Sequence, residues 1–478
     1  MYGNFGLFVD GAWRDHGTAD RIEVVDPATG AGIGDVPAAG LADAEEALAA
    51  AGRGFALWRA TPAWTRADLL HRMADVMHER TGEAARMITL ESGKPLVQAR
   101  REWALSVDQF RWYGEEARRI YGRIVESRAP GGRIEVLHEP VGIVGAFTAW
   151  NFPAVLIARK VAPALAAGCS VILRPSSEVP GVAMVMIDCL CAAGLPKGVV
   201  NLLVGPISTT YSPLVAAQAV RKVTLTGSTA VGQQMLRDAA ATLKRTSMEL
   251  GGNAPLLVFA DADLDAVLDL AVATKFANAG QICVAPDRFF VQDSLHDRFV
   301  SGFAARARVL RLGHGLDEAT QMGPLINSRR VAAMGEIVAD AERLGGRIET
   351  GGFPAQIDAN GYFFAPTVIS GLPDDAMALA EENFGPIAAV TSFSDDDEAY
   401  QRANDSAFGL AAYVFTKNPK RMREAAARLE SGMVGINSFT LAAAEAPFGG
   451  VRESGMGREG GAEGIFDFLN VKLAHLAA

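Results

Sequence analysis

From residue 141 onward, the sequence repeats one unit: a short apolar run, a turn with glycine or polar residues, and a helical stretch. Short apolar strands that alternate with helices are typical of a parallel sheet covered by helices on both faces. The pattern therefore predicts the α/β fold class with a doubly wound sheet. The predicted strands are 141–147, 170–173, 199–204 and 222–225, and the predicted helices are 154–167, 181–193 and one that starts at 229.

A second series of the same kind begins near residue 254, and 478 residues are too many for one hydrophobic core. We therefore expect two doubly wound α/β units with a cleft between them: residues 1–120 and 140–250 form the first, and 251–455 the second. A β pattern around 121–139, together with the tail 456–478, predicts a small third part. The remaining predicted strands are 255–259, 288–292, 388–393, 409–415 and 433–437, and the remaining predicted helices are 43–59, 65–92, 96–121, 264–277 and 295–311.

The composition argues against several classes of protein. The net charge is −10 with acids and bases interleaved, so a nucleic-acid partner is not expected. Four cysteines are too few for a disulfide framework, and the seven scattered histidines predict no metal site. The uncharged stretch 140–158 contains Thr148, Asn151 and Pro153, which fit a strand, a turn and a helix start better than a membrane span. Without a signal-peptide pattern, we expect a cytoplasmic protein.

Two residues that suit covalent catalysis stand one predicted helix apart. Glu249 lies in a glycine-rich turn, and Cys283 follows the predicted helix 264–277. A carboxylate can act as a base toward a cysteine nucleophile, so the pair predicts a thiol-based active site. The alternative is a structural cysteine, because free cysteines are among the most buried residues.

Polar residues also follow the predicted strands of the first series, where doubly wound sheets bind their ligands. The segments are 148–153, 174–177, 226–232 and the turn at 249. In the third segment, Gly227 allows close approach of a ligand, and the N-terminus of the following helix suits an anion such as a pyrophosphate. Together these segments predict a ligand site along one edge of the sheet.

These residues belong to motifs of a known family. Over its whole length the chain resembles the NAD(P)-dependent aldehyde dehydrogenases, and within them the succinate-semialdehyde dehydrogenase branch. The motifs that carry the resemblance are Trp150-Asn151-Phe152-Pro153, Thr226-Gly227-Ser228, Glu249-Leu250-Gly251-Gly252-Asn253, Gly280-Gln281-Ile282-Cys283, Glu382-Asn383-Phe384-Gly385-Pro386, Pro447-Phe448-Gly449-Gly450 and, for the branch, Asn253-Ala254-Pro255 and Gly455-Met456-Gly457-Arg458-Glu459-Gly460.

The resemblance implies a catalytic role for four residues. Cys283 would attack the aldehyde carbon as a thiolate, and the Asn151 amide with the Cys283 N–H would form the oxyanion hole. After hydride transfer to the nicotinamide, Glu249 would deprotonate a water molecule that hydrolyses the thioester. Lys160 would assist proton relay; a solvated helix charge is its alternative interpretation. Family members that pass the acyl group to coenzyme A generally lack the glutamate, so Glu249 favours water as the acceptor and a free acid as the product.

The resemblance also implies a cofactor site in residues 1–250. Where the family commonly has Lys-Pro-x-Glu beside the adenosine ribose, this chain has Arg174-Pro175-Ser176-Ser177. Serine removes the repulsion of a 2′-phosphate and arginine can pair with it, so we predict that NADP is accepted beside NAD. Glu178, one place later, partly restores the repulsion. The implied cofactor-binding residues are Thr148, Trp150, Arg174, Ser176, Ser177, Gly205, Gly227 and Ser228 on the first unit, with Leu250, Glu382 and Phe384.

The implied substrate residues depart from the branch. Arg159 matches the first of two arginines that bind a distal carboxylate, but Ala277 stands at the position of the second and Ala443 at that of a serine. Losing a cation and a hydroxyl leaves a roomier, more apolar pocket. We therefore expect a semialdehyde or a broader range of apolar and aromatic aldehydes, with an acid group that meets Arg159. Trp112, Tyr113 and Phe439 would line the mouth of the pocket, or serve as core aromatics.

Two alternatives to this function remain at this point. One is a succinate-semialdehyde dehydrogenase proper, and the other is a cofactor-free cysteine hydrolase or acyltransferase. The segment 121–139 and the tail 456–478 match the family's oligomerisation arm, so a homodimer or homotetramer is expected. By the same resemblance, residues 1–120 with 140–250 would bind the cofactor, and 251–455 would form the catalytic domain.

Overall fold

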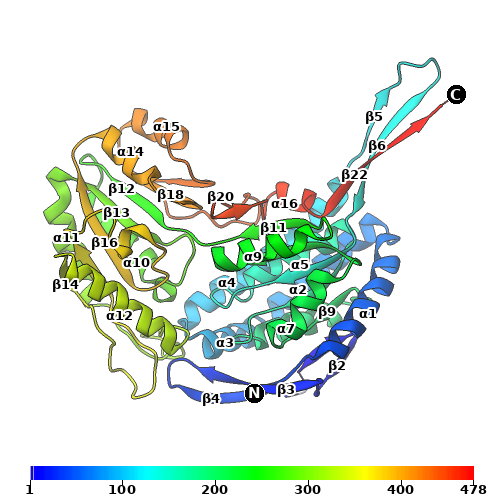
Figure 1. Ribbon diagram of the computed structural model, residues 1–478, viewed down its shortest axis with the longest axis horizontal. Coiled ribbons are helices and arrows are strands. Elements are labelled where there is room, and N and C mark those ends of the chain that lie inside the picture. Colours follow the sequence, from blue (N-terminus) through cyan, green and yellow to red (C-terminus); the bar gives the residue numbers. More distant parts are fainter. Residues whose placement is uncertain (1, 4, 478) are drawn as a thin grey trace.

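The computed structural model describes residues 2–3 and 5–477, and it contains two large sheets covered by helices (Figure 1). The centre of the first sheet is parallel, and its edges are antiparallel. Its strands in spatial order are β2 (Ala12–Arg14), β1 (Leu7–Val9), β9 (Val200–Leu202), β8 (Ser170–Arg174), β7 (Ile143–Phe147), β10 (Val220–Thr226), β11 (Arg245–Glu249) and β21 (Gly455–Met456).

The helices of the first half pack against this sheet and confirm the predicted α/β alternation. The predicted helix 65–92 is wrong in one respect: it is two helices, because Arg80 leaves helical geometry (φ −95°, ψ 16°) and its guanidinium pairs with Glu83 and Asp188. The helices are α1 (Leu41–Arg59), α2 (Ala63–Glu79), α3 (Thr81–Ser92), α4 (Leu96–Glu116), α5 (Val155–Ala167), α6 (Gly181–Ala192), α7 (Ile207–Thr210), α8 (Ser212–Ala216) and α9 (Thr229–Ala240).

The second sheet has six parallel strands and one antiparallel edge strand, β14. The region 328–370, which adds α12, β14 and β15, gave no strand or helix prediction from the sequence. In spatial order the strands are β14 (Arg347–Thr350), β15 (Thr367–Ser370), β16 (Ile387–Phe393), β13 (Pro286–Gln292), β12 (Ala254–Val258), β18 (Ala411–Phe415) and β19 (Met433–Ile436); the helices are α10 (Leu264–Lys275), α11 (Asp293–Arg308), α12 (Ser328–Arg343), α13 (Met377–Ala380), α14 (Asp396–Asn404) and α15 (Pro419–Arg428).

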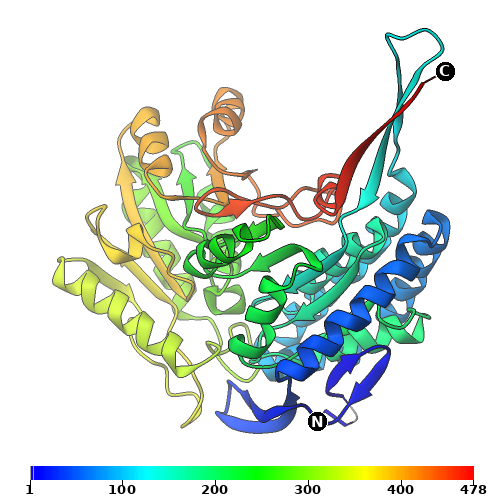
Figure 2. The same cartoon turned by 45° about the vertical axis from the view of Figure 1, so that its right-hand side comes forward.

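A three-stranded antiparallel sheet projects from the body of the molecule, and the C-terminus lies beside its tip (Figures 1 and 2). Here β22 (Leu469–Leu476) pairs with β6 (Arg133–Pro140), which pairs with β5 (Arg123–Glu126). We call these three strands the arm. The predicted β pattern and the predicted tail therefore lie in one sheet. The hairpin of β3 (Ala19–Asp26) and β4 (Ala31–Ala38) lies on the opposite side of the body.

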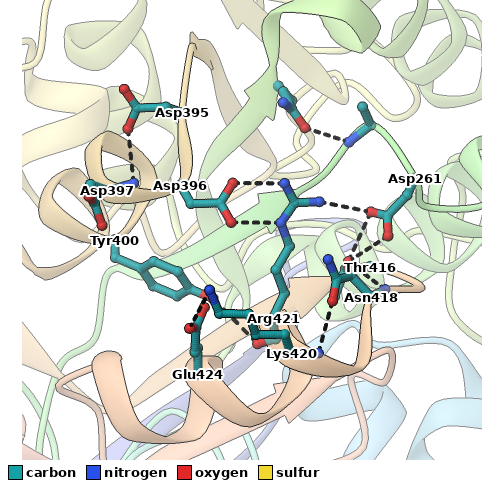
Figure 3. Close-up of polar contacts among 12 residues, drawn as sticks. Asp261, Asp395, Asp396, Asp397, Tyr400, Thr416, Asn418, Lys420, Arg421 and Glu424 are labelled. Atoms are coloured by element: carbon teal, nitrogen blue, oxygen red, sulfur yellow. Dashed lines mark hydrogen bonds and ion pairs between the residues drawn. The ribbon is translucent and has the colours of Figure 1, made fainter.

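Opposite edges of the two large sheets face each other and are in contact. Loops that follow strands of the first sheet meet loops that precede strands of the second: Cys283 precedes β13, and Glu382 precedes β16. The carboxyl edge of the second sheet is occupied instead by polar contacts around Arg421 (Figure 3). Its guanidinium forms two hydrogen bonds to Asp396, at 2.7 and 2.8 Å, and lies 3.5 Å from Asp261 after β12. This network occupies that edge with ion pairs and hydrogen bonds.

No helix within residues 2–3 and 5–477 is long and apolar enough to span a membrane.

Candidate active site

The loop that carries Cys283 has an unusual backbone. After α10, the short 3-10 helix Ala277–Gly280 contains three successive residues with positive φ: Asn278 (48°), Ala279 (53°) and Gly280 (72°). Such conformations cost non-glycine residues on the order of 1 kcal/mol or more and persist where the surroundings enforce them. Gly280 has no alternative, because a Cβ would lie 2.1 Å from the Gly385 carbonyl oxygen. The tight turn places Cys283 at the cleft, half-buried.

The Cys283 thiol is poorly acidic in this setting. Its pKa is raised to about 12: burial contributes most, the carboxylates of Glu249 and Glu382 add to the shift, and Arg159 opposes it. The thiol is therefore protonated at neutral pH, so an attack by its thiolate requires a base that accepts the proton.

Glu249, at the end of β11, has the properties of that base. It is 4% exposed, and neither carboxylate oxygen has a hydrogen-bond partner among the described residues. Burial raises its pKa well above the usual range, and Glu459 adds to the shift, while Lys160 and Arg159 oppose it. A Cβ on Gly449 would lie 2.8 Å from Glu249 Oε1, so glycine at this position leaves space beside the carboxylate.

Lys160 contacts a second buried carboxylate. Its side chain is fully buried in α5, forms an ion pair with Glu459, and donates a hydrogen bond to Thr226 Oγ1 at 2.7 Å. The interpretation of Lys160 as a solvated helix charge is therefore wrong. From the sequence, Glu459 was identified only as a member of a glycine-rich motif, without a role of its own. The signal was an acid among four glycines at 455–461.

Asn151 lies against the Cys283 loop. Its amide Nδ2 donates to the Gln281 carbonyl at 3.1 Å, and its Oδ1 has no partner within the described part of the chain. Its own backbone carbonyl accepts hydrogen bonds from Lys94 at 2.8 Å and from the Asn278 amide at 3.1 Å. The structure thus brings an amide donor to the loop that presents the thiol.

The predicted cofactor loops all lie on the carboxyl edge of the first sheet. Gly227 and the exposed Ser228 stand at the N-terminus of α9, whose free N–H groups suit a pyrophosphate. The loops after the other strands supply the remaining predicted residues of the first unit: Thr148 and Trp150 after β7, Arg174, Ser176 and Ser177 at and after β8, and Gly205 after β9.

The predicted adenosine end has internal contacts of its own. Arg174 Nη2 donates to the Gly205 carbonyl at 3.0 Å, and Nε contacts Thr210 Oγ1 at 3.4 Å. Ser176 donates to the Glu178 carboxylate, which lies 3.6 Å from the exposed Arg329 of α12. Ser177 is half-buried.

At the other end of the cofactor site, residues of both halves meet. The Trp150 and Phe384 rings pack edge to face at 5.4 Å, across the cleft. Glu382 Oε1 accepts the Gly252 N–H at 2.9 Å, and burial raises the Glu382 pKa to about 7. A Cβ on Gly251 would lie 2.7 Å from the other Glu382 oxygen. A carboxylate held between glycines and flanked by aromatic walls fits the ribose and ring of a nicotinamide nucleotide.

Among the predicted substrate residues, Arg159 is the most informative. It is 4% exposed, its Cζ lies 4.0 Å from the centre of the Phe448 ring, and its Nε has no hydrogen-bond partner among residues 2–3 and 5–477. Phe439 packs on Tyr413 at 4.8 Å, and Tyr413 donates to the Val284 carbonyl beside the nucleophile at 2.7 Å. Phe439 therefore belongs to the wall next to Cys283.

The remaining predicted substrate residues lie in different environments. Tyr113 is fully buried, so it is a core aromatic and does not line the mouth of a pocket. Trp112 borders a surface cavity of about 420 Å³ together with Ala444 and Glu445. Ala443 and Ala277 are half-buried.

The arrangement is that of a thiol enzyme with a nucleotide site. A protonated thiol beside an unpaired buried carboxylate can form a covalent intermediate, and the loops across the cleft can hold a redox nucleotide against it. Fold and site therefore have the features of the nicotinamide-dependent dehydrogenases that work through a cysteine.

The comparison with known proteins makes this specific. The model of the aldehyde dehydrogenase family matches residues 13–474, and the chain belongs to the aldehyde dehydrogenase family. Glutarate-semialdehyde dehydrogenase of Pseudomonas aeruginosa is 42% identical over 465 residues, which are 97% of this chain and 96% of that protein. The NADP(+) succinate-semialdehyde dehydrogenase GabD of Escherichia coli is 40% identical over 97% of this chain and 96% of its own length.

A solved structure agrees with the sequence relatives. Succinate-semialdehyde dehydrogenase from Burkholderia pseudomallei has a TM-score of 0.97 and 40% identity, and the match covers 99% of this chain and 98% of that one. The predicted fold class, the family and its semialdehyde dehydrogenase relatives are thus confirmed. The chain is an NAD(P)-dependent aldehyde dehydrogenase, and none of these three relatives supports a cofactor-free hydrolase.

Proposed function

We propose that this enzyme oxidises aldehydes that carry an acid group at the far end of an apolar or aromatic body. The observation that carries the proposal is the buried Arg159, whose guanidinium Nε has no hydrogen-bond partner among residues 2–3 and 5–477. A buried cation without a partner is costly, and an anionic substrate would supply the partner. Both semialdehyde dehydrogenase relatives are named for substrates that bear a carboxylate.

The chemistry begins at Cys283. Glu249 accepts the thiol proton through water, the thiolate sulfur bonds to the aldehyde carbon, and the carbonyl oxygen becomes an oxyanion. The Asn151 amide and the Cys283 N–H donate to that oxygen. The bound NAD(P)+ supplies the acceptor for the hydride that leaves the same carbon. The carbonyl then re-forms as a Cys283 thioester.

The thioester is released by water. Glu249 accepts a proton from a water molecule in the space beside Gly449, the water oxygen bonds to the acyl carbon, and the C–S bond breaks to return the thiol and the acid. The buried Lys160–Glu459 pair lies next to Glu249 and provides a path for its proton. The unpaired, buried Glu249 supports water rather than coenzyme A as the acyl acceptor.

An aldehyde panel tests the proposed substrate class. We expect 4-carboxybenzaldehyde to exceed benzaldehyde in kcat/KM, and Arg159→Met to remove that advantage, about 10- to 100-fold, because one charge-assisted contact is lost. The matched control is benzaldehyde itself, whose kcat/KM should change little in the variant. Clear selectivity for succinate semialdehyde over the aromatic acid would contradict the roomy pocket inferred from Ala277 and Ala443.

We also propose that the enzyme accepts NADP beside NAD. Ser177 carries no charge that would repel a 2′-phosphate. Arg174 uses Nη2 and Nε for the Gly205 carbonyl and the Thr210 hydroxyl, and its Nη1 has no hydrogen bond to residues 2–3 and 5–477. Ser177→Glu should lower kcat/KM for NADP on the order of 100-fold and spare NAD, because a carboxylate would face the 2′-phosphate. Glu178→Gln should have the opposite effect on the NADP/NAD ratio. A wild-type enzyme with a much higher kcat/KM for NAD would show that the interpretation of Ser177 is wrong.

The arm supports an oligomer, either a homodimer or a homotetramer. Its apolar side chains are exposed in the single chain: Ile124 by 67%, Val471 by 69% and Leu473 by 65%. Val471 and Leu473 lie on one face of β22, since alternate residues of a strand share a face. We expect Val471→Lys with Leu473→Lys to reduce the molar mass measured by analytical ultracentrifugation. Ile207→Lys, at a comparably exposed site on the body (65%), should leave it unchanged.

A further inference from the structure

The turn between α3 and α4 brings a buried lysine to the active site. Lys94 is 1% exposed, and its Nζ lies 2.8 Å from the Asn151 carbonyl, 2.5 Å from Glu102 Oε2 and 3.9 Å from the centre of the Phe152 ring. Two of its three N–H donors thus have hydrogen-bond acceptors, and the charge also lies over the face of an aromatic ring. None of these contacts is to solvent, so the side chain serves the interior of the protein.

Lys94 and its partner hold both sides of Asn151. The second carboxylate oxygen, Glu102 Oε1, accepts the N–H of Ala154 at 2.7 Å and of Val155 at 3.4 Å, at the start of α5. Lys94 thus fixes the carbonyl of Asn151, while Glu102 fixes the chain just after it. Burial lowers the pKa of Lys94, and the attraction of Glu102 works against that shift.

The same turn supports the loop opposite Asn151. Gly93 packs against Pro324, whose Cγ would lie 2.4 Å from an added Cβ. The loop that contains Pro324 also binds Gln281, whose Oε1 accepts a hydrogen bond from the Ile326 N–H at 2.9 Å. The Asn151 amide donates to the Gln281 carbonyl. The α3–α4 turn therefore contacts Asn151 directly, through Lys94, and Gln281 indirectly, through the segment that contains Pro324.

We propose that Lys94 is a positioning residue for the oxyanion hole. By bonding the Asn151 backbone carbonyl, Lys94 holds this residue so that its side-chain amide points at the reacting carbonyl oxygen. The inference rests on the proposed role of Asn151. Lys94 does not reach the thiol or the substrate; it acts only through Asn151. Displacement of a reacting group by about 1 Å costs on the order of 100-fold in rate, so an effect of about 10- to 100-fold is expected.

The test uses the variant Lys94→Met with Glu102→Gln. Glutamine keeps an acceptor for Ala154 N–H, so the change removes the donor to Asn151 without leaving a buried unpaired charge. We expect kcat/KM for benzaldehyde to fall about 10- to 100-fold, while alkylation of Cys283 by iodoacetamide, which forms no oxyanion, keeps its rate. Lys244→Met is the matched control: Lys244 is also buried and donates to the backbone carbonyls of Ala217 and Val220, at 2.6 and 2.8 Å, away from Asn151.

A double-mutant cycle separates the two proposals. In an Asn151→Ala background, the Lys94 and Glu102 changes should cost nothing further, because the residue they position is gone. The proposed role of Lys94 would be overturned if the losses in kcat/KM were additive. It would also be overturned if the Lys94 variant kept its kcat/KM while Asn151→Ala was impaired. Full activity of Asn151→Ala would instead refute the oxyanion hole itself. If the paired variant does not fold, Lys94→Gln, whose amide can still donate to Glu102, carries the same cycle with the same expected non-additivity.

Discussion

Replacing Cys283 with alanine is expected to abolish aldehyde oxidation, with a loss of kcat/KM on the order of 10⁴-fold or more. No other group described at the cleft can form the thioester, and the neighbouring Glu249 and Asn151 have no substrate to act on without it. Formation of NADH and NADPH should be followed by absorbance with the aldehyde panel. Binding of both cofactors, followed by fluorescence quenching, should persist, because the loops of the first sheet are unchanged.

Cys191→Ala is the matched control for this variant. Cys191 is also half-buried and unpaired, but it lies on α6, away from the central cleft. Its replacement should leave kcat/KM at the wild-type value. Dehydrogenase activity that survives in Cys283→Ala would contradict the proposed mechanism.

Replacing Glu249 with glutamine is expected to lower kcat about 10²- to 10³-fold, because general-base catalysis contributes on that scale. The thioester should then accumulate and be visible by mass spectrometry of the intact protein. The pH profile gives a second readout. A base works only when deprotonated, and the pKa of Glu249 is raised, so wild-type kcat should increase with pH through that raised value and level off above it. The variant should lose this rise.

Glu453→Gln provides the control for the loss of a carboxylate. Glu453 is exposed on the loop beside β21, so its replacement should change neither kcat nor the pH profile. If Glu249→Gln retained the wild-type pH dependence, the base in the reaction would be another group.

The elements that local pattern determines were predictable from the sequence. Short apolar runs alternate with helices, and this alternation predicted the two sheets and placed the loops after β7, β8 and β10 at one edge. The break at Arg80 was not predictable in this way, because the apolar spacing continues through it and the guanidinium partner, Asp188, lies on another helix.

Glu249 and Cys283 were singled out as a candidate pair by their residue types and motifs, whereas their surroundings depend on contacts between distant parts of the chain. Glu459 and Lys160 are 299 positions apart, and Lys94 and Asn151 are 57 apart. No local spacing encodes such neighbours. One signal was nevertheless present: apart from Arg159 and Lys160, α5 consists of apolar residues, and a helix of that kind is buried throughout. Lys160 could therefore have been predicted to lie in the interior.

The late position of Glu459 has a consequence for the order in which the protein becomes active during synthesis. A chain that has emerged through β19 already contains Cys283, Glu249 and the loops proposed to bind the nucleotide, but Lys160 still lacks its partner Glu459. The segment after β19, which adds β21 to the first sheet and then β22 to the arm, brings Glu459 into place. A chain that stops before residue 459 therefore leaves the buried Lys160 ammonium without the carboxylate that it pairs with in this structure.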